Sequence, residues 1–493
     1  MNVLLVYPKY PDTYWSFKHA LKFISKEAAI IPLGLVTIAS LLPEDWDKKL
    51  TDLNVSDLRD KDLQWADFVF ISAMSVQSKS VKLIIERCKQ HHKSIVAGGP
   101  LFTEEYEHYP EIDHLILNEA ELTLPLFLED LKNGKAEKVY QTGNFAEITN
   151  TPIPDYSLLK LNKYASVAIQ YSRGCPFDCE FCDVTALFGH KVRTKTSEQL
   201  ISELDYLFNI GWKGSVFFVD DNFIGHKHKL KSDILPKIIR WMKSNKYPFN
   251  FTTEASINLS DDNELMEMMV LAGFNKVFVG IETPEELCLT ECNKLQNNNR
   301  DLISCVNTIQ NYGMEVAAGF IVGFDNDPPN IFQRQIDFIQ KSGIISAMVG
   351  LLNAPRLSKL YQRLKTEGRI LEKSTGDNTD YSLNFIPVMD KDQLLNGYQK
   401  IIHDIYSSKS YYTRVKLFLK NYKPPPGTQK LPDFQEVVAL LKSVLVLGIM
   451  MKNRQYYWRL LFWSITRKPE SFVRAVTYSI YGYHFRKVFR NLT

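Results

Sequence analysis

The sequence has no hydrophobic run long enough to cross a membrane as a helix. The most membrane-like stretch contains only nine uncharged residues, 443–451, whereas a transmembrane helix needs about 20. The N-terminus lacks the basic region, the long apolar core and the cleavage site of a signal peptide. We therefore expect a cytoplasmic protein.

Cysteine is also scarce. The 493 residues contain seven cysteines, an odd number, and three of them lie between residues 175 and 182. This distribution argues against a disulfide scaffold and favours metal ligation in a reducing compartment. The sequence has no low-complexity segment, and its 45% apolar and 12% aromatic residues suffice for the cores of two to four folded domains.

Charge is nearly balanced over the whole chain but not along it. The formal net charge is +3, yet residues 401–493 contain 16 Lys and Arg against 4 Asp and Glu. Aromatic residues accompany this charge, and the combination favours a surface that contacts lipid headgroups. A helical domain with a solvated basic face would have the same composition, so both interpretations stay open. The aromatic residues include Tyr411, Tyr412, Tyr456, Tyr457, Trp458, Phe462 and Trp463.

Residues 1–150 alternate short apolar runs with helical patterns. This alternation predicts an α/β domain with a doubly wound, parallel, Rossmann-like sheet, which binds ligands at the carboxyl ends of its strands. Small residues at those ends would let a large flat ligand approach the backbone, although glycine and serine are also common in turns. The candidate residues there are Tyr7, Pro8, Ser72, Met74, Ser75, Gly98, Gly99, Pro100, Asn118, Glu119 and Glu121.

A proline-containing linker at residues 147–159 leads to a second periodic region at residues 160–354. Six β-rich runs alternate there with helical patterns, and a full eight-unit barrel needs about 250 residues. We therefore expect a partial (βα)6 barrel, followed by a mainly helical domain at residues 355–493. The six runs are residues 165–172, 215–221, 249–256, 276–283, 315–324 and 345–352.

Three cysteines follow the first barrel strand directly, with the spacing CxxxCxxC. Cys175, Cys179 and Cys182 could complete a tetrahedral zinc site with His190, but structural zinc usually has a second pair of cysteines, and none is present. A [4Fe-4S] cluster has four irons, so three protein ligands leave one iron open for a small molecule. We favour the cluster.

The cysteine motif, together with Phe181 before its last cysteine, resembles that of the radical S-adenosylmethionine (SAM) enzymes. The resemblance implies that Cys175, Cys179 and Cys182 bind the cluster and that SAM, chelated to the open iron, is cleaved to a 5′-deoxyadenosyl radical. It also implies a SAM site at the later strand ends. The SAM-binding candidates are Phe181, Asp220, Asp221, Glu254, Glu282, Gly319 and Gly323, although an acidic residue at a strand end can also cap a helix.

The first 150 residues resemble the cobalamin-binding domain of one class of these enzymes. The "VLLVYPKYP" start, the "GGP" loop and the "NEAE" stretch occur in that order, and the strand-end candidates become cobalamin contacts. The DxHxxG pattern of other cobalamin proteins is missing, which implies no axial histidine. Nearly the whole chain, including "QYSRGCPFDCEFCD" and "LYQRLKTEGRIL", resembles the hopanoid C-2 methylase group.

These resemblances imply a cobalamin-dependent radical SAM enzyme that methylates an unactivated carbon. One SAM would methylate cobalamin, a second would give the radical, and methylcobalamin would methylate the carbon radical of a lipid or other small molecule. A flavodoxin or ferredoxin would supply electrons, and the basic tail would give peripheral contact with the inner membrane surface; no nucleic acid is expected. Two alternatives stay open: rearrangement or ring formation without methyl transfer, and a non-enzymatic protein that binds cobalamin or nucleic acid.

Overall fold

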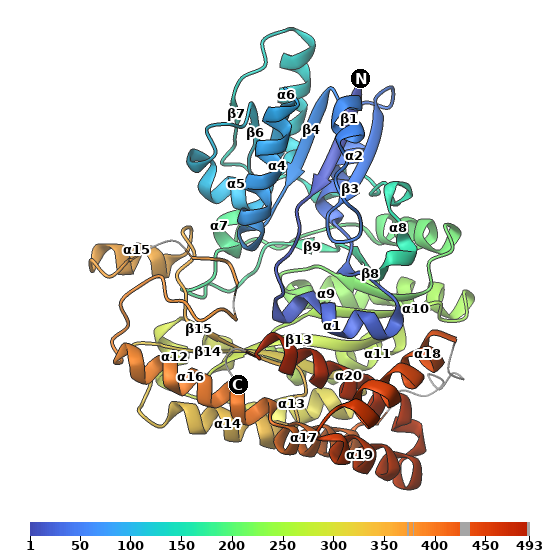
Figure 1. Cartoon of the computed structure of the whole chain (residues 1–493), viewed down its shortest axis with the longest axis vertical. Helices are drawn as coiled ribbons and strands as arrows, with labels where there is room; N and C mark the ends of the chain where they lie inside the picture. Colours follow the sequence, from blue (N-terminus) through green and yellow to red (C-terminus); the bar gives the residue numbers. More distant parts are fainter. Residues whose placement is uncertain (372–373, 378, 424–433, 491–493) are drawn as a thin grey trace.

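The computed structural model describes residues 1–371, 374–377, 379–423 and 434–490. Two parallel sheets follow one another along the long axis of the molecule, and C-terminal helices cover the side of the second sheet that lies away from the first (Figure 1). The predicted order of a Rossmann-like sheet, a partial barrel and a helical region is confirmed.

The first sheet has six parallel strands in the order β3-β1-β4-β5-β6-β7. Helices α2 (Leu33–Leu41) and α6 (Ala120–Lys132) cover one face, and α3 (Asp60–Trp65), α4 (Ser78–Gln90) and α5 (Pro100–Glu105) cover the other. Because β1 lies between β3 and β4, the winding reverses there, and a crevice is expected at the carboxyl ends of β1 and β4. The strands are β1 (Asn2–Tyr7), β3 (Asp47–Asp52), β4 (Phe68–Ser72), β5 (Ser94–Gly98), β6 (His114–Ile116) and β7 (Val139–Tyr140).

The second sheet contains the six predicted barrel strands, all parallel, in the order β15-β14-β13-β12-β11-β8-β2. Helices between the strands pack outside the curved sheet; they are α8 (Ser197–Asn209), α10 (Leu235–Ser244), α11 (Asn263–Ala272), α13 (Leu302–Asn311) and α14 (Ile331–Ser342). The predicted strands are β8 (Tyr164–Ile169), β11 (Gly214–Phe218), β12 (Phe249–Glu254), β13 (Phe274–Glu282), β14 (Glu315–Val322) and β15 (Ala347–Leu351).

The seventh strand of this sheet comes from the N-terminal region. β2 (Ala28–Ile30) pairs in parallel with β8, with Ala28 opposite Tyr164 and Ile30 opposite Ser166. The chain therefore leaves the first sheet after β1, adds an edge strand to the barrel, and returns through α2.

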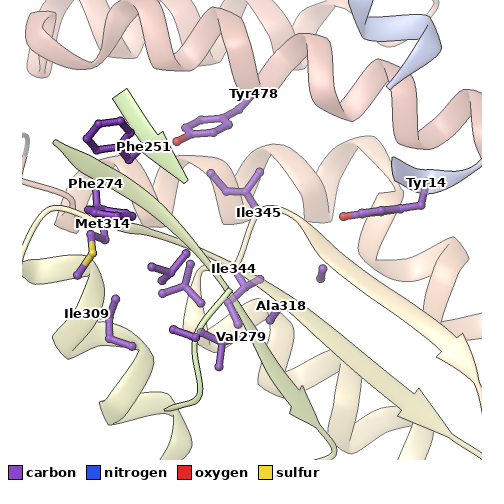
Figure 2. Packing of buried hydrophobic residues seen from close by; sticks show 14 of the residues in the cluster. Tyr14, Phe251, Phe274, Val279, Ile309, Met314, Ala318, Ile344, Ile345 and Tyr478 are labelled. Carbon is purple, nitrogen blue, oxygen red and sulfur yellow. The ribbon is translucent and has the colours of Figure 1, made fainter. Parts of the chain in front are cut away.

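All of the C-terminal helices except the first share one core with the barrel and with the N-terminal segment, whereas Leu360 and Leu364 of the first belong to a separate cluster. Tyr14, which precedes β2, and Tyr478 of α20 lie in the same cluster of buried side chains as Phe274 and Val279 of β13 (Figure 2). Among the described helices, none combines the length and apolar character that crossing a membrane requires. The helices are α15 (Lys359–Thr366), α16 (Lys391–Tyr406), α17 (Ser408–Asn421), α18 (Phe434–Ser443), α19 (Arg454–Arg467) and α20 (Phe472–Val488).

Candidate functional site

The cysteine loop begins at a small hairpin above the carboxyl end of β8. β9 (Ser172–Arg173) and β10 (Arg193–Thr194) pair antiparallel, and Cys175, Cys179 and Cys182 lie on the loop between them. Gly174 has a φ of +90°, and a Cβ atom there would lie 2.8 Å from the carbonyl oxygens of Gly189 and Lys191. Only glycine fits this entry to the loop.

Two aspartates that follow β11 hold the start of this loop. Asp220 accepts hydrogen bonds from the backbone N–H and hydroxyl of Ser172, and Asp221 accepts one from the Gly174 N–H at 3.0 Å. Burial raises the pKa of Asp220 to about 7 and that of Asp221 to about 6. Both SAM-binding candidates thus already have partners on the loop, and their contacts position it.

The three cysteine side chains are half-buried, and burial raises the pKa of all three thiols, that of Cys182 to about 12. Lys294 is the only cation among the main influences on Cys179. In the described part of the chain, no three His, Cys, Asp or Glu side chains converge on a point where one metal ion could bind. Three cysteines spread along one loop can instead bind three different irons of a cubane cluster, whose positive charge would stabilise the thiolates.

The strand ends of β12, β13 and β14 face this loop. The Glu254 carboxyl makes no hydrogen bond within the described residues, and burial, followed by the nearby Asp221, raises its pKa to about 8. Of the candidates at these strand ends, Glu254 alone is a carboxyl group without a protein partner, which suits a ligand group that the site still has to bind.

Glu282 lies at a bulge between β13 and β14 and has a φ of +64°, a left-handed conformation that residues other than glycine rarely adopt. Its carboxylate accepts a hydrogen bond from Lys294 Nζ at 2.6 Å. The same ammonium lies 5.8 Å from the centre of the Phe181 ring. Lys294 thus connects two predicted SAM-binding residues, although no sequence pattern pointed to it.

The two glycine candidates, Gly319 on β14 and Gly323 directly after it, differ in their surroundings. A Cβ atom on Gly319 would lie 3.1 Å from the Phe278 ring and 3.8 Å from Glu282 Oε2, so Gly319 leaves space beside that carboxylate. Gly323 has a φ of +110° and donates its N–H to Asp327 at 2.7 Å. Its conformation accounts for the glycine without any ligand.

A cavity of about 410 Å³ lies between the first sheet and the barrel. Gly34 of α2 and Leu187 and Phe188 of the cysteine loop also line it, so it reaches from one domain to the other. Two cobalamin candidates, Pro8 and Ser75, are not among its lining residues. The candidates that line it are Tyr7, Ser72, Met74, Gly98, Gly99, Pro100, Asn118, Glu119 and Glu121.

Two of these candidates are engaged in buried ion pairs with the hairpin that carries the cysteine loop. Glu119 binds both terminal nitrogens of Arg193, at 2.7 and 2.8 Å, and Glu121 binds those of Arg173, at 2.7 and 3.1 Å. Burial alone would raise the pKa of Glu121, but its hydrogen bonds and charge interaction with Arg173 outweigh burial and hold the pKa at about 2. These carboxylates therefore connect the first sheet to the cysteine loop.

The helical region contacts the same loop from another side. Arg363 of α15 donates to the two carboxylate oxygens of Glu180 at 2.6 and 3.0 Å, and Lys359 pairs with Asp178. The backbone N–H of Glu180 in turn donates to the Cys292 carbonyl. The loop is thus held by side chains from three parts of the chain.

Three family models match the chain and divide it in the same order as the structure. They are the B12 binding domain at residues 24–128, the radical SAM superfamily at residues 169–339, and a domain of unknown function, DUF4070, at residues 358–493. The fold and the site therefore define a radical SAM enzyme with a B12-binding domain, and it uses a [4Fe-4S] cluster, SAM and cobalamin.

Similar proteins identify the family. The chain is 39% identical over 490 residues to an uncharacterized methyltransferase of Synechocystis sp., covering 98% of this chain and 91% of that protein. It is 32% identical over 470 residues to the hopanoid C-2 methylase of Rhodopseudomonas palustris, covering 93% and 88%. The chain belongs to the cobalamin-dependent radical SAM methyltransferases.

A solved structure has the same fold. The radical SAM methyltransferase TsrM from Kitasatospora setae, with cobalamin and a [4Fe-4S] cluster bound, superposes with a TM-score of 0.64 at 13% identity, over 96% of this chain and 98% of that one. The predicted enzyme class and cofactors are confirmed, and the zinc and non-enzymatic alternatives are wrong. The assignment of individual residues to each cofactor stays a prediction.

Proposed function

We propose that this enzyme transfers a methyl group from SAM to an unactivated carbon of an apolar, ring-containing lipid. Cys175, Cys179 and Cys182 would bind the cluster, Glu254 and the strand-end residues around it would bind SAM, and the cavity under the first sheet would accept cobalamin. When bound, these cofactors supply the radical that abstracts a hydrogen atom from the substrate carbon and the methyl group that takes its place.

The observation that carries the lipid part of this proposal is the concave face of the barrel. Along β11, β12 and β13, buried residues alternate with half-buried ones, and the half-buried set shares its face with Glu254 and Gly280. This set includes Phe217 and Phe278, and Met348 lies half-buried on β15. The face below the candidate SAM site therefore presents aromatic and apolar side chains next to polar ones of the same half-buried set, which are Ser215, Asn250, Thr252 and Lys276.

Trp15 completes this face from the N-terminal segment. Its ring packs edge-on against Phe278 at 5.3 Å, and its indole N–H contacts the Met348 sulfur at 2.9 Å, yet 38% of the residue remains exposed. An exposed tryptophan between two apolar strand residues suits the flat surface of fused rings. The relative named hopanoid C-2 methylase supports the same class of substrate.

The decisive experiment uses SAM labelled in its methyl group, a low-potential reductant and a hopanoid in detergent, without oxygen. Methyl transfer predicts label in the lipid, with one S-adenosylhomocysteine and one 5′-deoxyadenosine per product. A rearrangement would leave the lipid unlabelled. The Cys179→Ala variant should give neither product, because the cluster would be lost.

The substrate surface can be tested separately. We expect Trp15→Ala to raise the KM for the lipid by about tenfold or more, because burying an aromatic side chain against the substrate is worth roughly 1.5–3 kcal/mol. The iron and cobalamin contents of the variant should stay unchanged. Trp46→Ala, at a half-buried tryptophan of the first domain, is the matched control. Unchanged lipid kinetics in the Trp15 variant would exclude this face as the substrate site.

A further inference from the structure

The hairpin formed by α18, η12 (Val444–Met450) and α19 exposes a row of large apolar side chains. On α18 and η12, the exposed residues recur at every fourth position, and a second set lies along α19. We call this set the apolar stripe. It consists of Val437, Leu441, Leu445, Ile449, Met450, Trp458, Phe462 and Ile465.

Exposed large apolar residues are more densely clustered in the stripe than on the surface of a typical soluble protein. It holds eight of the 23 large hydrophobic residues that are exposed in the described chain, within 29 residues of sequence. Leu441 is 65% exposed and Phe462 72% exposed. Scattered exposed leucines need no explanation, but a contiguous apolar surface marks an interaction site.

The fold does not need the stripe, because the same helices bury their other side. Leu447, Tyr457 and Leu461 are at most 3% exposed and belong to the main core. The two helices also form one surface: the Trp458 indole N–H donates to the Gly448 carbonyl at 2.9 Å, and a Cβ atom on Gly448 would lie 2.9 Å from the Trp458 ring.

The charge around the stripe identifies the partner. Lys452, Arg454, Arg459 and Arg467 are exposed, and none has an ion pair within the described residues. Between residues 434 and 490, the sequence has ten Lys and Arg against only two Glu. Unpaired cations beside apolar and tryptophan side chains complement an anionic lipid surface. There the cations can contact the phosphate groups while the apolar side chains enter the boundary between headgroups and acyl chains.

A second copy of this chain would fit the stripe less well. In a two-fold contact the same surface faces itself, so the unpaired arginines and lysines would be brought together. Like charges at close range oppose association. A lipid surface rich in phosphate groups would bury the apolar side chains equally well, and its negative charges would attract the arginines and lysines.

We propose that the apolar stripe docks the enzyme onto anionic membrane surfaces, with α18 and α19 lying in the headgroup region. This assigns a binding role to part of the domain of unknown function at residues 358–493. The proposal does not depend on which substrate is methylated.

The test measures cosedimentation of the full-length holoenzyme with phosphatidylcholine vesicles containing 30% phosphatidylglycerol, and with pure phosphatidylcholine vesicles. We expect binding to the anionic vesicles at low salt and release at high salt. Leu441→Gln with Leu445→Gln and Ile449→Gln should weaken binding by roughly 100-fold or more. Lys452→Gln with Arg454→Gln and Arg459→Gln should weaken it by roughly 100-fold, and only on anionic vesicles.

Matched controls come from the first domain. Leu83→Gln with Leu126→Gln removes two exposed leucines, and Lys79→Gln with Lys82→Gln removes two exposed cations. Both should bind vesicles like the parent, and circular dichroism and iron content should show that every variant is folded.

Failure of the folded parent to bind anionic vesicles would overturn the proposal, as would parent-like binding by the stripe variant. A dimer in light scattering that the stripe variant dissociates would assign the surface to a second copy. Binding to RNA that needs the cations but not the stripe would equally overturn the lipid assignment.

Discussion

At the scale of single residues, two arginine–glutamate pairs hold the first sheet against the hairpin that carries the cysteine loop. Arg173 and Arg193 face each other across the β9–β10 hairpin, and their partners Glu119 and Glu121 lie two residues apart at the start of α6. The "NEAE" stretch is thus matched to the two strands that flank the cysteine loop. Sequence alone identified the stretch but not its partners, because nothing in a sequence specifies which distant charges meet.

Breaking one of these pairs should destabilise the protein strongly. Glu119→Gln leaves the guanidinium of Arg193, a residue that is 9% exposed, without its carboxylate, and we expect a loss of about 3–5 kcal/mol in the free energy of unfolding. Asp261→Asn, which breaks the exposed bidentate pair with Arg300, should cost about 0–1 kcal/mol. Denaturant unfolding measures both.

The double variant Glu119→Leu with Arg193→Met should recover part of the loss, since it leaves no buried charge unpaired. Equal small losses in the Glu119 and Asp261 variants would mean that the buried pair contributes no more than a surface pair.

Glycine at the cavity provides a second residue-scale test. A Cβ atom on Gly98 would lie 2.6 Å from the Ile116 carbonyl oxygen, so substitution there distorts the sheet itself. Gly34 is more useful, because a Cβ atom there meets only Ser72 Oγ, at 3.9 Å, and Gly34 lines the cavity. We expect Gly34→Ala to be tolerated and Gly34→Phe to reduce cobalamin content severalfold by filling the cavity.

The cobalamin absorbance of purified protein, relative to its iron content, measures this effect. Normal cobalamin content in a folded Gly34→Phe variant would place the corrin away from the α2 side of the cavity.

At the scale of elements, the strands that sequence predicted are those with continuous apolar runs. Four strands of the first sheet and five of the six barrel strands contain such runs, because parallel strands covered on both faces are mostly apolar; the exception is β12, FNFTTE, in which buried and half-buried residues alternate. β3 has the sequence DKKLTD and lies at a sheet edge, β7 has two residues, and β2 has three. Edge strands this short or polar give no periodic signal.

Helix α15 offers an element-scale prediction, since its Arg363 holds Glu180 between Cys179 and Phe181. Arg363→Gln should loosen the cysteine loop and weaken cluster binding by about tenfold or more, the scale seen when partners around metal ligands are removed. Arg369→Gln is a matched control, because Arg369 shares Asp325 and Glu367 with Arg363 but, within the described residues, makes no hydrogen bond or ion pair with the cysteine loop. Iron content under competing chelator distinguishes them.

Similar cluster retention in the two variants would show that α15 docks on the loop without stabilising it.

At the scale of the whole molecule, the two ends of the chain fold against each other. Tyr411, Tyr412 and Tyr457, which the composition associated with a headgroup surface, are buried, whereas Trp458 and Phe462 are exposed. Composition could not separate these groups, because core and interface both use aromatic residues. The Tyr478 hydroxyl donates to Glu315 of β14 at 2.9 Å, so removing the tail would open the barrel core.

One histidine should make this contact between the two ends of the chain sensitive to pH. His484 of α20 is fully buried, stacks on Phe17 at 5.2 Å, and has Nε2 2.9 Å from the Tyr14 carbonyl oxygen. Its Nδ1 has no hydrogen-bond partner within the described residues. Burial, the main cause, lowers the pKa of His484 to about 4.

Because the folded pKa lies below the value of about 6.5 in an unfolded chain, the neutral side chain stabilises the fold fully only above pH 6.5. As the pH falls from 6.5 to about 4, the unfolded state takes up a proton that the folded state does not, and the free energy of unfolding should fall by about 3 kcal/mol from this group. His484→Gln can still donate to the Tyr14 carbonyl and cannot titrate. We expect this variant to lose less stability than the parent between pH 7 and pH 4.5 in urea unfolding. If the free energy of unfolding fell equally with pH in both proteins, protonation of His484 would not contribute to the acid sensitivity of the fold.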